Sequence, residues 1–243
     1  GVAALLEPDG IFVFEVSYLA DVFQQTLFDP IYHEHLRYHT VKPLPALFAR
    51  HGMELIEAIR VESHGGSLRG IAKRRGGRWP QQAGVSRLIA LEDSLGLSRP
   101  DTFRKFFQDI QQRKAELLAA LRQRRQQGRR IVGFGAPAKA TTLMYAFELG
   151  PEILERILDD NPLKQGRYSP GHHVPVVPSS ALYESPRPAS SQSRGGPAPD
   201  AALILAWNFA ESIITKHARF LEQGGEFIIP LPTVKIISAS TAR

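Results

Sequence analysis

Residues 129–140 read RRIVGFGAPAKA, a pattern typical of a strand that turns tightly into a helix. The apolar stretch at 129–134 predicts a buried strand, and a helix is predicted at 141–149. A glycine-rich turn between them presents backbone N–H groups at the positive end of the helix, where anions bind. The spacing lacks the third glycine of GxGxxG, so a tight turn with close helix packing explains the glycines without a ligand.

The residues that follow continue the alternation of strands and helices. Strands are predicted within residues 153–158 and at 201–207 and 226–230, and a helix at 209–222. The loop at 163–177 carries Lys164, Arg167 and Tyr168, whose donors suit a phosphate or a sugar. A serine-rich part of residues 179–200 reads as a flexible surface insertion. The alternation predicts a small Rossmann-like sheet.

Towards the N-terminus the pattern predicts a long helix at 101–127 and a second α/β region before it. Residues 11–16 predict a buried strand, and residues 44–51 a helix that ends at Gly52. Strands at 53–61 and 67–74 flank His64, Gly65, Gly66 and Ser67. The adjacent glycines allow either a close approach to a ligand or a sharp hairpin turn, and both interpretations stay open.

Residues 28–40 read FDPIYHEHLRYHT and hold three histidines, two tyrosines, one glutamate and one aspartate. Groups of this kind move protons near neutral pH, and the prolines around them predict a loop. The residues allow a proton-transfer loop, a solvated structural loop, or a metal site at His33 and His35 with His39. Without cysteines or an HExxH pattern, we predict no metal in this chain.

The composition narrows the classes of function. The chain has 243 residues, 43% of them hydrophobic, no cysteine and a net charge of +6. Without cysteines it has no disulfide and no thiolate metal site, which fits a cytoplasmic protein. The basic runs at 73–78 and 122–130 lack interleaved aromatic residues, so we expect no nucleic-acid partner. No apolar stretch is long enough for a bilayer, so we expect no membrane partner.

Several stretches together resemble one family. LLEPDGIFVFEV resembles a late strand of class I S-adenosylmethionine-dependent methyltransferase domains. FDPIYHEHLRYHT, HGGSLRG, GFGAPAKATTL, DDNPLKQGRYSPG and AWNFAESIITK follow in the order found in sugar C-methyltransferases. Those enzymes methylate a nucleotide-linked keto-deoxysugar. The resemblance extends over nearly the whole chain, apart from the predicted connector and the serine-rich insertion.

The resemblance implies an α/β fold in which the C-terminal part of a class I methyltransferase Rossmann-like sheet precedes a second, smaller Rossmann-like domain. We expect the first at residues 1–75, a helical connector at 76–128 and the C-terminal C-methyltransferase domain at 129–243. The family's zinc-binding module and its early glycine-rich cofactor loop have no counterpart here. The chain is therefore expected to be an N-terminally truncated piece, with zinc only in the missing part. S-adenosylmethionine is the implied cofactor, and its binding residues stay unassigned.

The resemblance also implies roles for individual residues. Tyr32, Glu34 and His35 match the family positions at the reacting carbon, with His35 as the base and the other two positioning or polarising the substrate. A nucleotide-diphosphate sugar is the implied substrate. The residues whose motifs would face it are His64, Gly65, Gly66, Ser67, Gly133, Gly135, Lys139, Lys164, Arg167 and Tyr168.

Two other functions remain open at this point. The GFGAPAK turn allows an NAD(P)-dependent oxidoreductase, although the expected acidic partner of the ribose falls at Asp159 and Asp160, in a different setting. A chain that truly began at Gly1 would instead be a non-catalytic nucleotide-sugar-binding fragment.

Overall fold

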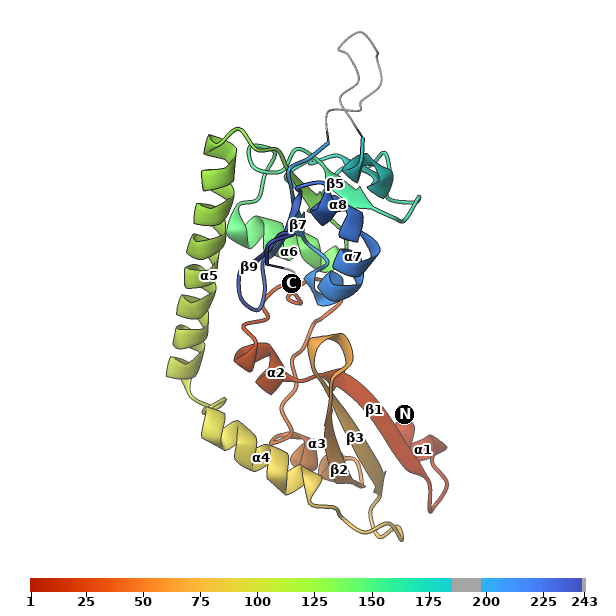
Figure 1. Cartoon of the computed structure of the whole chain (residues 1–243). Helices are drawn as coiled ribbons and strands as arrows, with labels where there is room; N and C mark the ends of the chain where they lie inside the picture. Colours follow the sequence, from red (N-terminus) through yellow and green to blue (C-terminus); the bar gives the residue numbers. More distant parts are fainter. Residues whose placement is uncertain (185–197, 242–243) are drawn as a thin grey trace. The chain divides into compact units, whose positions relative to one another are not determined.

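The computed structural model describes residues 1–184 and 198–241. Most of the predicted serine-rich insertion therefore lies outside the described residues. The chain divides into two compact units (Figure 1). The N-terminal unit comprises Gly1–Leu27 and His35–Asp109, and the C-terminal unit comprises Phe28–Glu34 and Ile110–Arg243. The short segment Phe28–Glu34 thus belongs to the unit that is distant from it in sequence.

The N-terminal unit is built on a three-stranded antiparallel sheet. Strands β1 (Ile11–Ser17), β2 (Met53–Val61) and β3 (Ser67–Arg74) pair in the order β1-β3-β2, so β3 is central. The predicted bounds of β2 and β3 are confirmed. The prediction of a buried strand at 11–16 is wrong in its burial, because Ile11 and Val13 are 43% and 49% exposed. β1 is an edge strand, and its alternate side chains point away from the core.

Four helices accompany this sheet. One buried carboxylate, that of Glu92, joins separate parts of the N-terminal unit. The helices are α1 (Val2–Leu5), α2 (Leu19–Gln24), α3 (Leu44–Arg50) and α4 (Gly84–Leu95). Glu92 of α4 is buried. Its Oε1 accepts hydrogen bonds from Tyr18 Oη (3.0 Å) and Val41 N (2.6 Å), and its Oε2 accepts one from Lys42 N (3.0 Å). Glu92 therefore fixes the chain immediately after the histidine-rich stretch.

Helix α5 (Pro100–Gln126) confirms the predicted long helix and is uninterrupted in Figure 1. The division between the two units falls inside it, between Asp109 and Ile110. Its second half contributes Leu117, Leu118 and Leu121 to the buried residues of the C-terminal unit. These leucines recur at helical spacing on the face that packs.

The C-terminal unit contains a six-stranded sheet in the order β6-β5-β4-β7-β8-β9. Neighbouring strands are parallel except β9, which is antiparallel to β8. The bounds are β4 (Ile131–Phe134), β5 (Ile157–Asp159), β6 (Val176–Pro178), β7 (Ala201–Ile204), β8 (Glu226–Ile229) and β9 (Lys235–Ile237). The predicted Rossmann-like sheet is confirmed. β6 and β9 escaped prediction because each has three residues, too few for a periodic signal.

Helices flank this sheet on both faces. α6 (Ala138–Phe147) connects β4 to β5, while η3 (Trp207–Phe209), α7 (Ala210–Lys216) and α8 (Ala218–Glu222) connect β7 to β8. Right-handed crossovers towards opposite edges of the sheet place these connections on opposite faces. The turn η2 (Ser179–Leu182), with α7 and α8, packs on the face that carries Val132, Phe134, Ala202 and Ile204.

The predicted helix at 209–222 is divided at His217, which is buried. Its ring lies 5.0 Å from the Phe134 ring in an edge-on arrangement, and its Nδ1 is 2.9 Å from Tyr183 Oη. These contacts hold the imidazole against β4. Burial, and secondarily the charge of Lys216, lowers the pKa of His217, while Asp160 opposes the shift.

We predict that His217 makes folding sensitive to mild acid. A lowered pKa means that the folded state prefers the neutral imidazole, so its stabilisation is present above about pH 6.5 and is lost as the pH falls through the folded pKa. The free energy of unfolding, measured by urea denaturation, should decrease between about pH 7.5 and about pH 5. His217→Gln should make this decrease shallower, whereas His51→Gln, at an exposed position, should not. An unchanged pH slope in His217→Gln would contradict the prediction.

We also predict that Glu92→Gln lowers the free energy of unfolding by about 2–3 kcal/mol. An amide has only one acceptor oxygen, so it cannot accept from Tyr18, Val41 and Lys42 as the carboxylate does. The neighbouring Asp93→Asn removes an exposed pair with Lys42 and should cost less than about 0.5 kcal/mol. Equal decreases in the free energy of unfolding for the two variants would show that the hydrogen bonds to Glu92 do not stabilise the fold.

Candidate functional site

The strand order of the C-terminal sheet reverses between β4 and β7, because the chain leaves β4 towards one edge and β7 towards the other. In open α/β sheets, ligands bind outside the carboxyl ends of the strands at such a switch point. Here the two loops approach each other closely. Gly135 has φ +85°, and a Cβ on it would lie 2.5 Å from Ala206 Cβ. Only glycine fits this position.

The segment Phe28–Glu34 lies at this switch point. Asp29 is fully buried, and its Oδ2 accepts a hydrogen bond from Trp207 Nε1 at 2.6 Å. Lys139 Nζ, from the first turn of α6, lies 3.4 Å from the same oxygen and 3.8 Å from the centre of the Trp207 ring. The loops that follow β4 and β7 thus bind a carboxylate of the chain itself.

Burial is the largest influence on the pKa values of Asp29 and Lys139. Burial raises the pKa of Asp29 and lowers that of Lys139, while the attraction between the two groups opposes both shifts. An ionised carboxylate in an apolar site is costly unless it is paired and hydrogen-bonded. Lys139 and Trp207 together meet this need. The ammonium predicted to bind substrate is therefore engaged inside the unit.

Tyr32 and Glu34 follow in the same segment. Tyr32 Oη donates to Glu34 Oε2 at 3.4 Å, and His33 Nε2 lies 3.8 Å from Glu34 Oε1. Burial, and then the charge of Glu34, raises the pKa of Tyr32, so the phenol keeps its proton near neutral pH. His35 is half-buried and belongs to the N-terminal unit. The three predicted catalytic residues are therefore divided between the two units.

The HGGS stretch forms the connection between β2 and β3, so the hairpin interpretation is confirmed. His64 lies in the short turn η1 (Ser63–Gly65). Ser67 begins β3, is buried, and donates to Ser63 O at 3.3 Å. Gly66 has φ +122°, and a Cβ there would lie 2.3 Å from Asp21 Cβ.

A pocket of about 550 Å³ lies beside these glycines. It is lined by Asp21, Gln25, Arg60, Val61, Glu62, Gly65 and Gly66. Arg60 Nε donates to Asp21 Oδ1 at 2.7 Å, and Gln25 Nε2 donates to Gly65 O at 3.0 Å. The half-exposed Arg60 is ion-paired with Asp21, and Glu62 adds a second carboxylate to the lining of the pocket. Sequence reasoning missed Arg60 and Gln25, because neither stands in a stretch of unusual composition.

The glycine-rich turn after β4 has an internal partner of its own. Asp159 is buried at the end of β5, and its Oδ2 accepts from Ala136 N at 2.6 Å. Its Oδ1 accepts from Asn161 N at 2.8 Å. Lys164 Nζ donates to Ala136 O at 2.9 Å and lies 3.5 Å from Asp159 Oδ2. The carboxylate therefore takes the backbone amide that a bound phosphate would need.

The other predicted residues of the C-terminal unit lie apart from this turn. Gly133 is inside β4, where a Cβ would lie 2.8 Å from Leu205 Cδ1, so close packing accounts for it. Tyr168 pairs with Pro175 before β6 begins, at the opposite end of that strand from Lys164. Arg167 and Tyr168 line a pocket of about 410 Å³ with Arg130, Glu155, Arg156, Gly166, Pro175, Val176, Val177 and Pro178.

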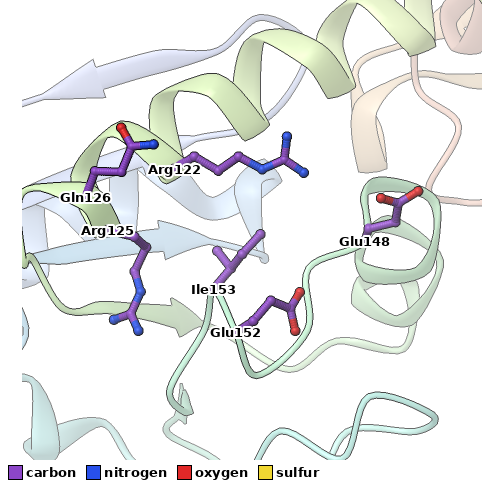
Figure 2. Close-up of a pocket in the computed structure, with 6 residues that line it drawn as sticks. All are labelled: Arg122, Arg125, Gln126, Glu148, Glu152 and Ile153. Carbon is purple, nitrogen blue, oxygen red and sulfur yellow. The ribbon is translucent and has the colours of Figure 1, made fainter.

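The basic run at 122–130 is largely used within the C-terminal unit. Arg124 and Arg129 both bind the buried Glu226, with Arg129 Nη1 at 2.7 Å. Arg125 and Arg130 bind Glu155. A pocket of about 280 Å³ lies beside this run and mixes both signs of charge (Figure 2). It is lined by Arg122, Arg125 and Gln126 of α5 and by Glu148, Glu152 and Ile153.

In residues 1–184 and 198–241, no three histidine, aspartate or glutamate side chains lie together as a metal site would require. No helix in these ranges has both the length and the apolar character needed to cross a bilayer.

Comparison with known proteins agrees with the resemblance found in the motifs. The family described as "C-methyltransferase C-terminal domain" matches residues 62–232, which is more than half of the chain. C-methyltransferase NovU from Streptomyces niveus is 35% identical over 241 residues, covering 99% of this chain and 54% of that protein. The chain thus spans about half the length of this curated relative. The chain belongs to the C-methyltransferase family and carries its C-terminal domain.

Proposed function

We propose that this protein takes part in methyl transfer from S-adenosylmethionine to a carbon next to the keto group of a nucleotide-linked deoxysugar. The observation that carries the proposal is the placement of Tyr32 and Glu34, side by side on a segment held at the switch point of the C-terminal sheet. Membership of the C-methyltransferase family supports the reaction class. The relative NovU is named a C-methyltransferase.

The chemistry requires a base and a group that stabilises an enolate. A C–H next to a ketone is acidic because the resulting carbanion delocalises onto the carbonyl oxygen. An imidazole with a pKa near about 6.5 can take this proton, and we assign that role to His35. The raised pKa of Tyr32 means that the phenol keeps its proton near neutral pH. Its single O–H donates to Glu34 in the free protein, and we propose that it turns to the enolate oxygen when the substrate binds. Glu34 holds the phenol in place until then.

The methyl donor supplies an electrophilic methyl group when bound. We assign none of the described residues to it. The glycine-rich turn after β4 does not fit the role, because Asp159 takes the Ala136 amide and Asp29 lies at the switch point. The roles proposed for this chain's residues are therefore deprotonation and stabilisation of the enolate.

Two pockets support a proposal for the substrate contacts. We propose His64, Gly65, Gly66 and Ser67 for the sugar, since Gly65 and Gly66 line a pocket whose Arg60 and Gln25 offer hydrogen-bond donors. We propose Arg167, Tyr168 and Lys164 as contacts of the nucleotide diphosphate. Arg167 and Tyr168 line a second pocket, and Lys164 lies at the other end of β6. Gly133, Gly135 and Lys139 make internal contacts that account for their presence.

An NAD(P)-dependent oxidoreductase is the alternative that the sequence left open. Asp159 stands at the end of β5, where such a protein carries its ribose-binding acid, but the buried Asp29 at the switch point weighs against it. Isothermal titration calorimetry of the chain with NADH should therefore give no binding heat, whereas a thymidine-diphosphate keto-deoxysugar should bind. Micromolar binding of NADH, about −8 kcal/mol, would contradict the proposal and favour the oxidoreductase.

We predict that His35→Gln slows proton abstraction by about 10²-fold or more. The measurement is incorporation of deuterium from D₂O into the keto-sugar, followed by mass spectrometry, with the protein as encoded in full. This exchange reports deprotonation separately from methyl transfer, which is measured in parallel with labelled S-adenosylmethionine. His51→Gln, an exposed histidine of the same unit, serves as the matched control and should retain both rates. Retention of both rates by His35→Gln would remove His35 from the role of base.

A further inference from the structure

We propose that Asp29, Lys139 and Trp207 are positioning residues, which hold Tyr32 and Glu34 in their reactive arrangement by binding the segment Phe28–Glu34 into the switch point of the C-terminal sheet. The inference rests on the proposed function. All of these residues belong to the C-terminal unit, so the inference depends only on contacts within that unit.

The switch point of the C-terminal sheet holds a segment of the chain itself. Trp207 follows β7 in η3, and Lys139 lies in the first turn of the helix that follows β4. Both converge on Asp29 Oδ2, at 2.6 Å and 3.4 Å. The place where an open α/β sheet ordinarily binds a ligand is therefore used here to hold a segment of the same protein.

The segment Phe28–Glu34 is held at several points in succession. The Phe28 ring lies 4.9 Å from the Phe147 ring, and Thr142 Oγ1 donates to Ile31 O at 2.9 Å. Phe147 and Thr142 both come from α6, as does Lys139. Within the segment, Ile31 N donates to Phe28 O at 3.0 Å, and Tyr32 N donates to Pro30 O at 2.9 Å. The backbone is thus fixed up to the residue that carries the phenol.

Asp29 attaches the segment through only one of its two carboxylate oxygens. Asp29 Oδ1 is buried and has no hydrogen-bond partner among the described residues, so Oδ2 carries both polar contacts. A buried charge that loses its partner is strongly unfavourable. The segment can therefore leave this place only by exposing or neutralising Asp29. Displacement of a reacting group by about 1 Å can lower a rate by about 10²-fold.

Hydrogen–deuterium exchange of the free protein tests the anchoring without any substrate. In Asp29→Asn and in Lys139→Met, the amides of Ile31 and Tyr32 should exchange about 10-fold faster or more. The double variant Asp29→Asn, Lys139→Met has no buried charge and can still accept from Trp207 Nε1, so exchange should return close to that of the wild type. Lys114→Met is the matched control, since it removes an exposed pair with Glu148 in the same unit. Unchanged exchange in both single variants would overturn the proposal.

Kinetics test whether the anchor acts through Tyr32. Asp29→Asn should lower kcat for deuterium incorporation by about 10- to 100-fold with little change in KM. In a Tyr32→Phe background the same substitution should lower kcat by a clearly smaller factor, because the group it positions is already gone. Equal factors in both backgrounds would indicate general destabilisation and overturn the positioning role. Thr142→Ala, which removes only the hydrogen bond to Ile31 O, should act in the same direction more weakly and covers the case of an Asp29 variant that fails to fold.

The two proposals fail separately. A wild-type protein that neither exchanges nor methylates the keto-sugar would refute the proposed function. The exchange of the Ile31 and Tyr32 amides would still show whether Asp29 holds the segment.

Discussion

A carboxylate without water must find donors inside the protein, and in this chain that requirement falls on Asp29. Its oxygen accepts from the Trp207 indole and lies beside the Lys139 ammonium, so three stretches far apart in sequence are joined at one buried point. The Lys139 ammonium also lies over the Trp207 ring, which adds a cation–π contact to the ion pair. The placement of the candidate reactive segment depends on this contact.

A second buried carboxylate acts on the far side of the histidine-rich stretch. Glu92 accepts from Tyr18 and from the backbone at Val41 and Lys42, within the N-terminal unit. The stretch therefore begins at an anchor in one unit and ends at an anchor in the other. In both cases a buried acid accepts hydrogen bonds from donors in other elements, which makes removal of either acid costly.

The glycine-rich turn after β4 makes its hydrogen bonds within the protein itself. Gly135 adopts a positive φ and meets Ala206 closely, as a nucleotide-binding turn would. Yet Asp159 accepts from the free amide of Ala136, and Lys164 closes over the same loop. An internal carboxylate thus binds the amide at the start of this turn, and the turn links β4, β5 and α6.

Local sequence patterns determined the class of fold, the strands at 53–61 and 67–74, the long helix α5 and the density of proton-transfer groups at 28–40. These follow from hydrophobic periodicity and turn chemistry, which act between near neighbours. The three-residue strands β6 and β9, the break at His217 and the exposed face of β1 did not follow, because they depend on which elements lie alongside. The same holds for the site. Tyr32, Glu34 and His35 stood out by composition, but only the tertiary structure assigned Phe28–Glu34 to the C-terminal unit and paired Lys139 with Asp29. Burial of a charge is a property of its surroundings, and those surroundings are supplied by residues more than a hundred positions away.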